Sequence, residues 1–332
     1  MQRIYGSRLR AMYHIEKGLE KIMAAITAAM VKELREMTGA GMMDCKKALA
    51  ANDGDMDAAV EFLRKNGQAK AEKKASRIAA EGLVKTVISG NCAAVVEVNS
   101  ETDFVAKNET FQAYVAEVAA QAVASDAADM DAFMEEAWNA DPSKTVKEAL
   151  VEKIAVIGEN LKIRRYEKLV EDNGCIVEYI HMGGKIGVLV DIESDVVNDA
   201  VKEMGKNVAM QIAALSPKYI DRSEISEEYI AHEKEILMAQ IQNDPKESQK
   251  PAKVIEGMIN GRINKELKEI CLVDQVYVKA EDGKQTVAKY IDEVAKANGA
   301  KISVKKFVRF ETGEGLEKKS ENFAEEVAKQ MM

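Results

Sequence analysis

The side chains best able to do chemistry in this chain are few and widely spaced. No histidine stands beside a plausible nucleophile, and no cysteine pair has the Cys-x-x-Cys spacing of a zinc site. The cysteine spacing also gives no disulfide framework, which favours a reducing cytoplasm. We therefore expect no metal, no cofactor and no covalent catalysis. The residues concerned are His14, His181, His232, Cys45, Cys92, Cys175 and Cys271.

The composition sets further limits on function. The chain has 332 residues, 47 % hydrophobic and 31 % charged, which is typical of a soluble protein with two or three domains. Its net charge of -9 argues against direct nucleic-acid binding, which needs a basic face. The chain lacks both common phosphate-binding glycine motifs and any apolar run of the roughly 20 residues that cross a bilayer. These limits argue against an enzyme and against a membrane protein.

Residues 101–108 place an aromatic ring between polar groups where a buried strand ends. The preceding run, residues 93–98, is short and rich in β-branched residues, so it predicts a mostly buried strand. The polar segment therefore begins at the exit of a strand. Its sequence is ETDFVAKN.

A second copy of this pattern indicates what is special about the first. Residues 95–101 resemble residues 189–195, and residues 121–125 downstream resemble residues 211–216. The first copy has more residues between strand and helix, and this longer connection carries Asp103 and Phe104. A loop tipped with phenylalanine is interpreted as a contact with a partner. The alternative, in which Phe104 folds back to cap its own strand, stays open on the pattern alone.

The remaining segments predict the elements that position this loop. Residues 1–22 carry a basic excess unlike a normal domain start, so we expect Met23 to be the natural first residue. Residues 23–67 predict a bundle of three helices, broken at residues 38–41 and ending near Gly67. A basic linker is expected at residues 68–78.

Met42 and Met43 stand next to each other at the start of the second predicted helix. Neighbouring side chains on a helix point roughly 100° apart, so both are not expected to be fully buried. Methionine adapts to varied partners, which favours a contact surface. The alternative is two methionines at the edge of the bundle core.

Two α+β repeats with antiparallel sheets are predicted to form the core. The first spans residues 79–160, and the second spans residues 161–220 and 272–310. The strands are expected at residues 82–89, 92–99, 161–166, 176–181, 186–192, 275–280 and 301–310, and the helices at residues 110–125, 130–138, 143–157 and 287–297.

The second repeat is interrupted by an insertion at residues 221–271, which predicts two antiparallel helices. The expected seam contains Ile225, Tyr229, His232, Ile236 and Ala239 on one helix, and apolar residues between positions 255 and 270 on the other. Such a hairpin either stabilises itself or serves another protein, and homodimer formation through it stays open.

The last segment, residues 311–332, is predicted to end in an amphipathic helix. Phe323, Val327 and Met331 recur there at intervals of four.

Three motifs resemble the bacterial elongation factor Ts family. They are TGAGMMDCKKAL at residues 38–49, ETDFVAKN at residues 101–108, and RFE at residues 309–311 followed by GEG at residues 313–315. The likeness runs in consistent order from residue 23 to about residue 329. It implies a guanine-nucleotide exchange factor for the GTPase elongation factor Tu, and a C-terminal helix that embraces this GTPase.

The resemblance also implies roles for the second motif. Phe104 would wedge between helices of the GTPase, and Asp103 would perturb the network that holds Mg²⁺. Thr102 and Val105, which flank this pair, would belong to the same partner contact.

The other implied contacts lie elsewhere in the chain. Arg35, Met42 and Met43 would form part of a pocket on the N-terminal bundle, and His181 would contact the GTPase near its nucleotide. Two other classes of function stay open: a metabolic α+β enzyme that uses His181, and a binding adaptor, because the bundle also resembles ubiquitin-associated domains.

Overall fold

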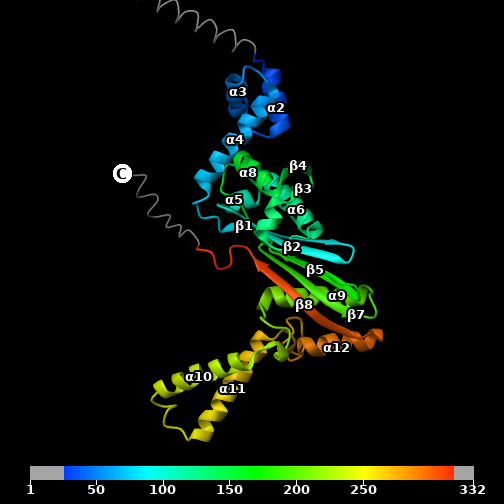
Figure 1. Cartoon of the computed structure of the whole chain (residues 1–332). Helices are drawn as coiled ribbons and strands as arrows, with labels where there is room; N and C mark the ends of the chain where they lie inside the picture. Colours follow the sequence, from blue (N-terminus) through cyan, green and yellow to red (C-terminus); the bar gives the residue numbers. More distant parts are fainter. Residues whose placement is uncertain (1–25, 318–332) are drawn as a thin grey trace, which may run out of the picture.

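The computed structural model describes residues 26–317 as an α+β chain (Figure 1). Helices form one end of the molecule, two sheets form its middle, and a helical hairpin projects at the other end. Three predictions lie outside the described residues. These are the extension at residues 1–22, the start at Met23, and the C-terminal helix with Phe323, Val327 and Met331.

Three helices form the N-terminal bundle: α2 (Ala28–Thr38), α3 (Met42–Ala51) and α4 (Met56–Lys74). The side chains of Thr27 and Asp55 cap α2 and α4, and Gly39 ends α2 in the left-handed region. Their likeness to a ubiquitin-associated domain remains a prediction. The small core that joins the three helices contains Val31, Leu34, Cys45, Ala48, Leu49 and Ala59.

Helix α4 continues past its predicted end at Gly67 and finishes at Lys74. The predicted linker at residues 68–78 is therefore helical in its first part. A β-carbon at Gly67 would lie 3.6 Å from Cβ of Ala155 on α8 (Val146–Ile157), which is an ordinary van der Waals distance. Gly67 therefore lies where α4 packs on α8, and the predicted helix end is wrong because a single glycine weakens a helix without ending it.

The first sheet has the strand order β1-β2-β5, with both pairs antiparallel: β1 (Glu81–Ser89), β2 (Cys92–Ser100) and β5 (Lys162–Val170). The strands at residues 82–89 and 92–99 are confirmed. The strand predicted to open the second repeat is β5, and its hydrogen bonds place it beside β2 instead. Its apolar pattern could not specify this pairing.

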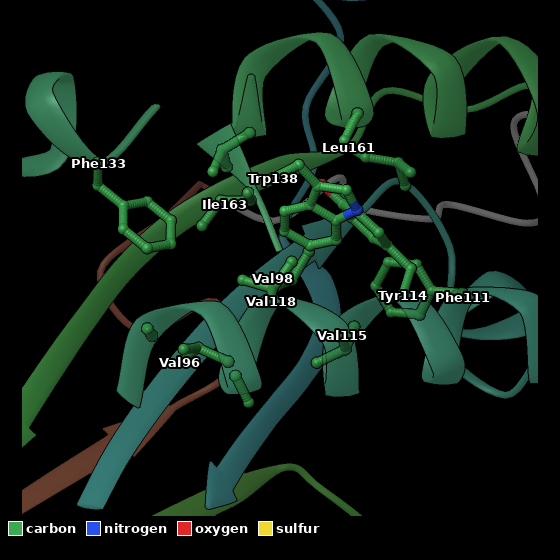
Figure 2. Packing of buried hydrophobic residues seen from close by; sticks show 14 of the residues in the cluster. Val96, Val98, Phe111, Tyr114, Val115, Val118, Phe133, Trp138, Leu161 and Ile163 are labelled. Atoms are coloured by element: carbon green, nitrogen blue, oxygen red, sulfur yellow. The ribbon is translucent and has the colours of Figure 1, made fainter. Parts of the chain in front are cut away.

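Helix α6 (Glu109–Ala124) packs on the first sheet, and α8 packs against α6. Figure 2 shows the aromatic centre of this core, where Tyr114 of α6 lies near Phe111 and Trp138, with Val98 of β2 beside Trp138 and Val96 farther along the same strand. The ring centroids of Tyr114 and Trp138 are 6.0 Å apart. This core supports the end of β2, where the predicted site begins.

Two predicted helices differ from the structure between α6 and α8. Helix α7 covers Met130–Glu135, but a small hairpin of β3 (Ala137–Trp138) and β4 (Asp141–Thr145) follows it. Helix α8 begins at Val146 rather than residue 143, because Thr145 forms a capping box with Glu148. The Asp-Pro-Ser segment belongs to the strand that leads to this cap.

The second sheet has the order β6-β7-β8: β6 (Gly174–His181), β7 (Ile186–Ser194) and β8 (Ile302–Glu311). Helices α9 (Asp199–Leu215) and α12 (Val287–Asn298) contribute to its core. Both sheets are antiparallel. In each, the first two strands form a hairpin, and the second of them, β2 or β7, is the central strand. That they are duplicated repeats remains a prediction. A shared cluster joins the two sheets: Val84, Ala93, Val95, Leu169, Leu189, Val308 and Phe310.

The strand predicted at residues 275–280 is wrong. This segment follows a short 3₁₀ helix, η2 (Leu272–Asp274), and forms only an isolated bridge between Val276 and Thr286. The side chain of Gln211 donates to Val276 O at 3.1 Å and accepts from Val278 N at 2.8 Å. A buried amide thus takes backbone bonds that a neighbouring strand would otherwise make.

The insertion forms the predicted helical hairpin, with η1 (Arg222–Glu224) before α10 (Glu227–Asn243) and α11 (Ala252–Ile270). Ile259, Ile263 and Leu267 line the seam on α11, as predicted. The predicted seam on α10 is wrong for His232, Ile236 and Ala239, which are exposed. The prediction is confirmed for Ile225 and Tyr229, which belong to the hairpin core. The other α10 side chains in this core are Ile230, Leu237 and Ile241.

Candidate partner-binding site

The segment after β2 is a one-turn helix rather than a loop. Helix α5 spans Asp103–Ala106 and is capped by Thr102, whose Oγ1 accepts from Val105 N at 3.3 Å. Asn108 caps the next helix, α6, by accepting from Thr110 N at 2.8 Å. Two caps within seven residues thus place a short helix at the end of β2.

The four residues of α5 divide into an inner and an outer side. Ala106 is buried, and Val105 packs against the core between the first sheet and α6, which we call the first core. Phe104, in contrast, is 81 % exposed. The alternative in which Phe104 folds back onto its strand is therefore wrong. An aromatic ring left in water on an otherwise packed element marks a candidate contact surface.

The carboxylate of Glu159 accepts three hydrogen bonds from the chain just before α5. Its Oε2 accepts from Glu101 N at 3.0 Å and from Thr102 N at 3.1 Å, and its Oε1 accepts from the Thr102 hydroxyl at 2.7 Å. A hydrogen bond also runs in the opposite direction: the backbone N–H of Asn160 donates to Glu101 Oε1 at 2.6 Å. Residues 101–102 and 159–160 therefore hold each other by reciprocal bonds.

Asp103 carries a fixed negative charge beside the exposed ring. Lys107 Nζ lies 2.7 Å from Asp103 Oδ2, one helical turn away. This hydrogen bond, with the positive charges of Lys107 and Lys185, lowers the pKa of Asp103. The outer face of α5 thus presents an ionised carboxylate next to an apolar ring.

His181 is the last residue of β6, just before the turn to β7. It is exposed, and its Nδ1 is 2.9 Å from the Tyr179 hydroxyl. The next residue, Met182, is 72 % exposed and has a positive φ of 49°. Gly184 anchors the turn, since its carbonyl accepts from Val84 N at 2.7 Å.

This turn and α5 come together through β1. Helix α5 contacts β1, and β1 contacts β6 and β7. Lys185, at the end of the turn, forms an ion pair with Glu81 of β1, and its positive charge also contributes to lowering the pKa of Asp103. Two predicted contact segments that lie far apart in the sequence therefore share one region of the molecule.

Arg35, Met42 and Met43 lie around the α2–α3 turn of the bundle, and all three are exposed. The exposed fractions of Met42 and Met43 are 56 % and 65 %, so they are surface residues rather than core-edge residues. A β-carbon at Gly39 in this turn would lie 3.5 Å from Val156 on α8. The end of α8 thus contacts the bundle turn shortly before Glu159 contacts the chain at α5.

Sequence reasoning missed Glu159 and Asn160. They follow Gly158, which ends α8 in the left-handed region. That glycine signals the end of the helix, but a sequence signal does not reveal which backbone groups the next side chain will meet.

Within residues 26–317, no group of three histidine, cysteine, aspartate or glutamate side chains is arranged to hold a metal ion. In the same range, no helix combines the length and apolar character needed to cross a membrane.

Comparison with known proteins gives consistent matches. The family model described as Elongation factor TS matches residues 101–314. Elongation factor Ts of Clostridium novyi (strain NT) is 52 % identical over 308 residues, covering 92 % of this chain and 99 % of that protein. Elongation factor Ts of Clostridioides difficile (strain 630) is 52 % identical over 311 residues, covering 93 % and 100 %. That of Clostridium tetani (strain Massachusetts / E88) is 51 % identical over 308 residues, covering 92 % and 99 %.

Proposed function

Because this chain belongs to the elongation factor Ts family, we propose that it accelerates GDP release from elongation factor Tu by inserting the tip of α5 into that GTPase. Family membership makes the chain a nucleotide exchange factor of translation elongation. The proposal adds the mechanism: Phe104 enters the GTPase, and Asp103 disturbs its magnesium and phosphate site. We place this activity in the cytoplasm, together with protein synthesis.

The observation that carries this mechanism is the exposure of Phe104. A phenylalanine that is 81 % exposed contributes little to its own fold but has apolar area to bury elsewhere. Burying a phenylalanine side chain contributes roughly 1.5 to 3 kcal/mol, and about 1.4 kcal/mol changes an equilibrium tenfold. Phe104 can thus offset about one to two decades of nucleotide affinity.

The charge of Asp103 supports a role at a cation site. Its pKa is held low by Lys107 and Lys185, so the carboxylate stays ionised at neutral pH. An ionised carboxylate brought near bound Mg²⁺ and phosphate alters the local charge balance that holds the nucleotide. Charge and apolar area on one small helix therefore act on two parts of the nucleotide site.

Exchange needs more than one contact. Factor and nucleotide weaken each other reciprocally, so the factor must offset much of the nucleotide's binding energy. Arg35, Met42, Met43 and His181 offer exposed side chains for additional contacts, and Thr102 and Val105 belong to the α5 contact. We propose that these groups bind the same GTPase together with α5.

The test is the release of fluorescent GDP from purified elongation factor Tu, with and without this protein. Phe104→Ala should slow the stimulated release by roughly 10- to 100-fold. Its thermal unfolding should match that of the unmodified protein, because the ring is exposed. Val276→Ala, which truncates another exposed apolar side chain, is the control. Normal GDP release by Phe104→Ala would refute the mechanism.

Self-association through α10 and α11 remains a separate prediction. Ile236 and Met238 on α10 are 37 % and 39 % exposed, and Val254 on α11 is 47 % exposed. Sedimentation over a range of protein concentrations would detect a homodimer, and replacing Ile236 and Val254 with lysine should dissociate one formed here.

A further inference from the structure

Helix α5 is too short to hold its own shape. Nucleating a helix is unfavourable because several residues must be fixed for each hydrogen bond gained. A four-residue helix that presents an exposed ring therefore needs support from other parts of the chain. The cap from Thr102 satisfies one backbone donor, Val105 N, but Thr102 belongs to the same short segment that it caps.

The support with the strongest geometry comes from Glu159. Its carboxylate receives two backbone N–H donors and the Thr102 hydroxyl, all at 2.7 to 3.1 Å. Hydrogen bonds to an ionised acceptor are roughly twice as strong as neutral ones. Thr102 is also the cap of α5, so Glu159 orients the cap itself.

The base of this support is fixed. Glu159 follows α8, whose Ile154 is buried in the first core and whose Ala155 packs against Gly67 of α4. Asn160 adds a second anchor, because its side chain donates to Arg77 O at 2.8 Å while its N–H donates to Glu101. Movement of residues 101–102 therefore requires breaking bonds to a packed part of the molecule.

We propose that Glu159 is a positioning residue that holds α5 in the conformation in which Phe104 projects outward. Glu159 acts through Thr102 and Glu101. This inference rests on the proposed function for its effect on exchange, whereas its effect on the order of α5 is independent of that function. Preorganising the tip lowers the entropy lost when it binds, so loosening it should weaken exchange without removing a partner contact.

The proposal predicts graded effects for two variants. Glu159→Ala removes all three acceptors, and Glu159→Gln keeps an amide oxygen for the backbone N–H groups but loses the charge. The maximal rate of stimulated GDP release should fall roughly tenfold for Glu159→Ala, equal to about 1.4 kcal/mol, and less for Glu159→Gln. Glu203→Gln, an exposed glutamate on α9, is the control and should leave the rate unchanged.

Amide hydrogen exchange measures the positioning directly in the full-length protein. The N–H groups of Glu101, Thr102 and Val105 should exchange faster in Glu159→Ala, while amides of β2 and β5 keep their protection. Unchanged exchange at these amides would overturn the proposal. If Glu159→Ala loses protection throughout the chain, the comparison is made with Glu159→Gln.

A double variant separates positioning from direct contact. If Glu159 acts through the tip, adding Glu159→Ala to Phe104→Ala should slow GDP release by less than the tenfold seen alone. A full additional tenfold loss would overturn the positioning role. Faster amide exchange together with normal GDP release by Glu159→Ala would also overturn it, provided that Phe104→Ala is slow. If Phe104→Ala itself releases GDP normally, the proposed function fails, and the amide measurement alone decides the role of Glu159.

Discussion

The buried carboxylate of Glu97 accepts a hydrogen bond at 2.8 Å from the backbone N–H of Gly313, 216 positions later in the chain. Glu97 lies in the middle of β2, and Gly313 follows β8 in the second sheet. A β-carbon at Gly313 would lie only 2.1 Å from Ala80 O, and φ there is +72°. The glycine near the end of the chain thus lets the two sheets share one charged centre.

Replacing Glu97 with glutamine should destabilise the protein by about 3 kcal/mol, because it leaves buried donors without an ionised partner. Arg164 Nη1 and Arg165 Nε lie 3.0 Å and 2.6 Å from the carboxylate, and Asn99 also donates to it. Urea unfolding of Glu97→Gln at pH 7.5 measures this loss. Glu167→Gln, which breaks an exposed ion pair with Lys306, should cost less than about 1 kcal/mol.

The ionisation of Glu97 also makes the stability of the folded protein depend on pH. Burial disfavours the ionised form of Glu97, but hydrogen bonds from Gly313, Asn99 and Arg164 and the charge of Arg165 hold its pKa below the usual value. A lowered folded pKa gives a stabilisation that is complete above the unfolded pKa of about 4.3 and is lost as the pH falls through the folded pKa. The stability difference between the protein and Glu97→Gln should therefore shrink below about pH 4.3. A difference that is constant down to pH 3 would contradict this assignment.

Asp191 should show the opposite dependence on pH. Burial, a hydrogen bond with Glu171 and the charge of Glu171 raise its pKa to about 6, against the opposing charges of Lys305 and Lys306. The folded protein therefore favours the protonated form. Stability should fall as the pH rises from the unfolded pKa of about 3.9 to the folded value, and stay lower above it.

Asp191→Asn removes this ionisation and keeps a donor for Glu171. Its stability relative to the unmodified protein should increase by about 2 kcal/mol between pH 4.5 and pH 7.5. Denaturant unfolding at both pH values measures the change. Asp292→Asn, at an exposed position on α12, should give the same difference at both. A pH-independent effect of Asp191→Asn would show that Asp191 does not take up a proton on folding.

The β6–β7 turn should tolerate alanine at one glycine better than at the other. Gly184 has φ of +100°, and a β-carbon there would lie 2.8 Å from Leu83 Cδ2, whereas Gly183 has φ of +64° and open space. Gly184→Ala should cost about 2 to 3 kcal/mol, from strain and contact, and Gly183→Ala about 1 kcal/mol, from strain alone. Chemical unfolding of the two variants tests the order. Equal losses would mean that the turn is not fixed against β1 as the structure places it.

Replacing Met42 and Met43 together with alanine should separate binding from stability. Both side chains are more than half exposed, so the melting temperature should change little. If they contact elongation factor Tu, the dissociation constant of the nucleotide-free complex should rise roughly tenfold, as for about 1.4 kcal/mol of lost contact. Isothermal titration measures this constant. The matched change, Leu34→Ala in the bundle core, should lower stability instead, since Leu34 is fully buried.

The sequence by itself determined the elements whose signals are local. Apolar periodicity located β1, β2, α6 and the hairpin helices to within a few residues, because these patterns reflect neighbours along the chain. The three motifs were sufficient to identify the family, since long specific runs do not depend on knowing the fold. The polar-aromatic segment at residues 101–108 was also recognised, although its helical turn was not.

Only the tertiary structure decided how these elements support one another. Gly67 is a residue type that often ends helices, but it lies inside α4, where that helix packs on α8. Strand β5 belongs to the first sheet because its backbone donors and acceptors meet those of β2. Glu159 reaches Thr102 across 57 positions and Glu97 reaches Gly313 across 216. A side chain's partner at such separation is set by how the whole chain packs, and local periodicity carries no information about it.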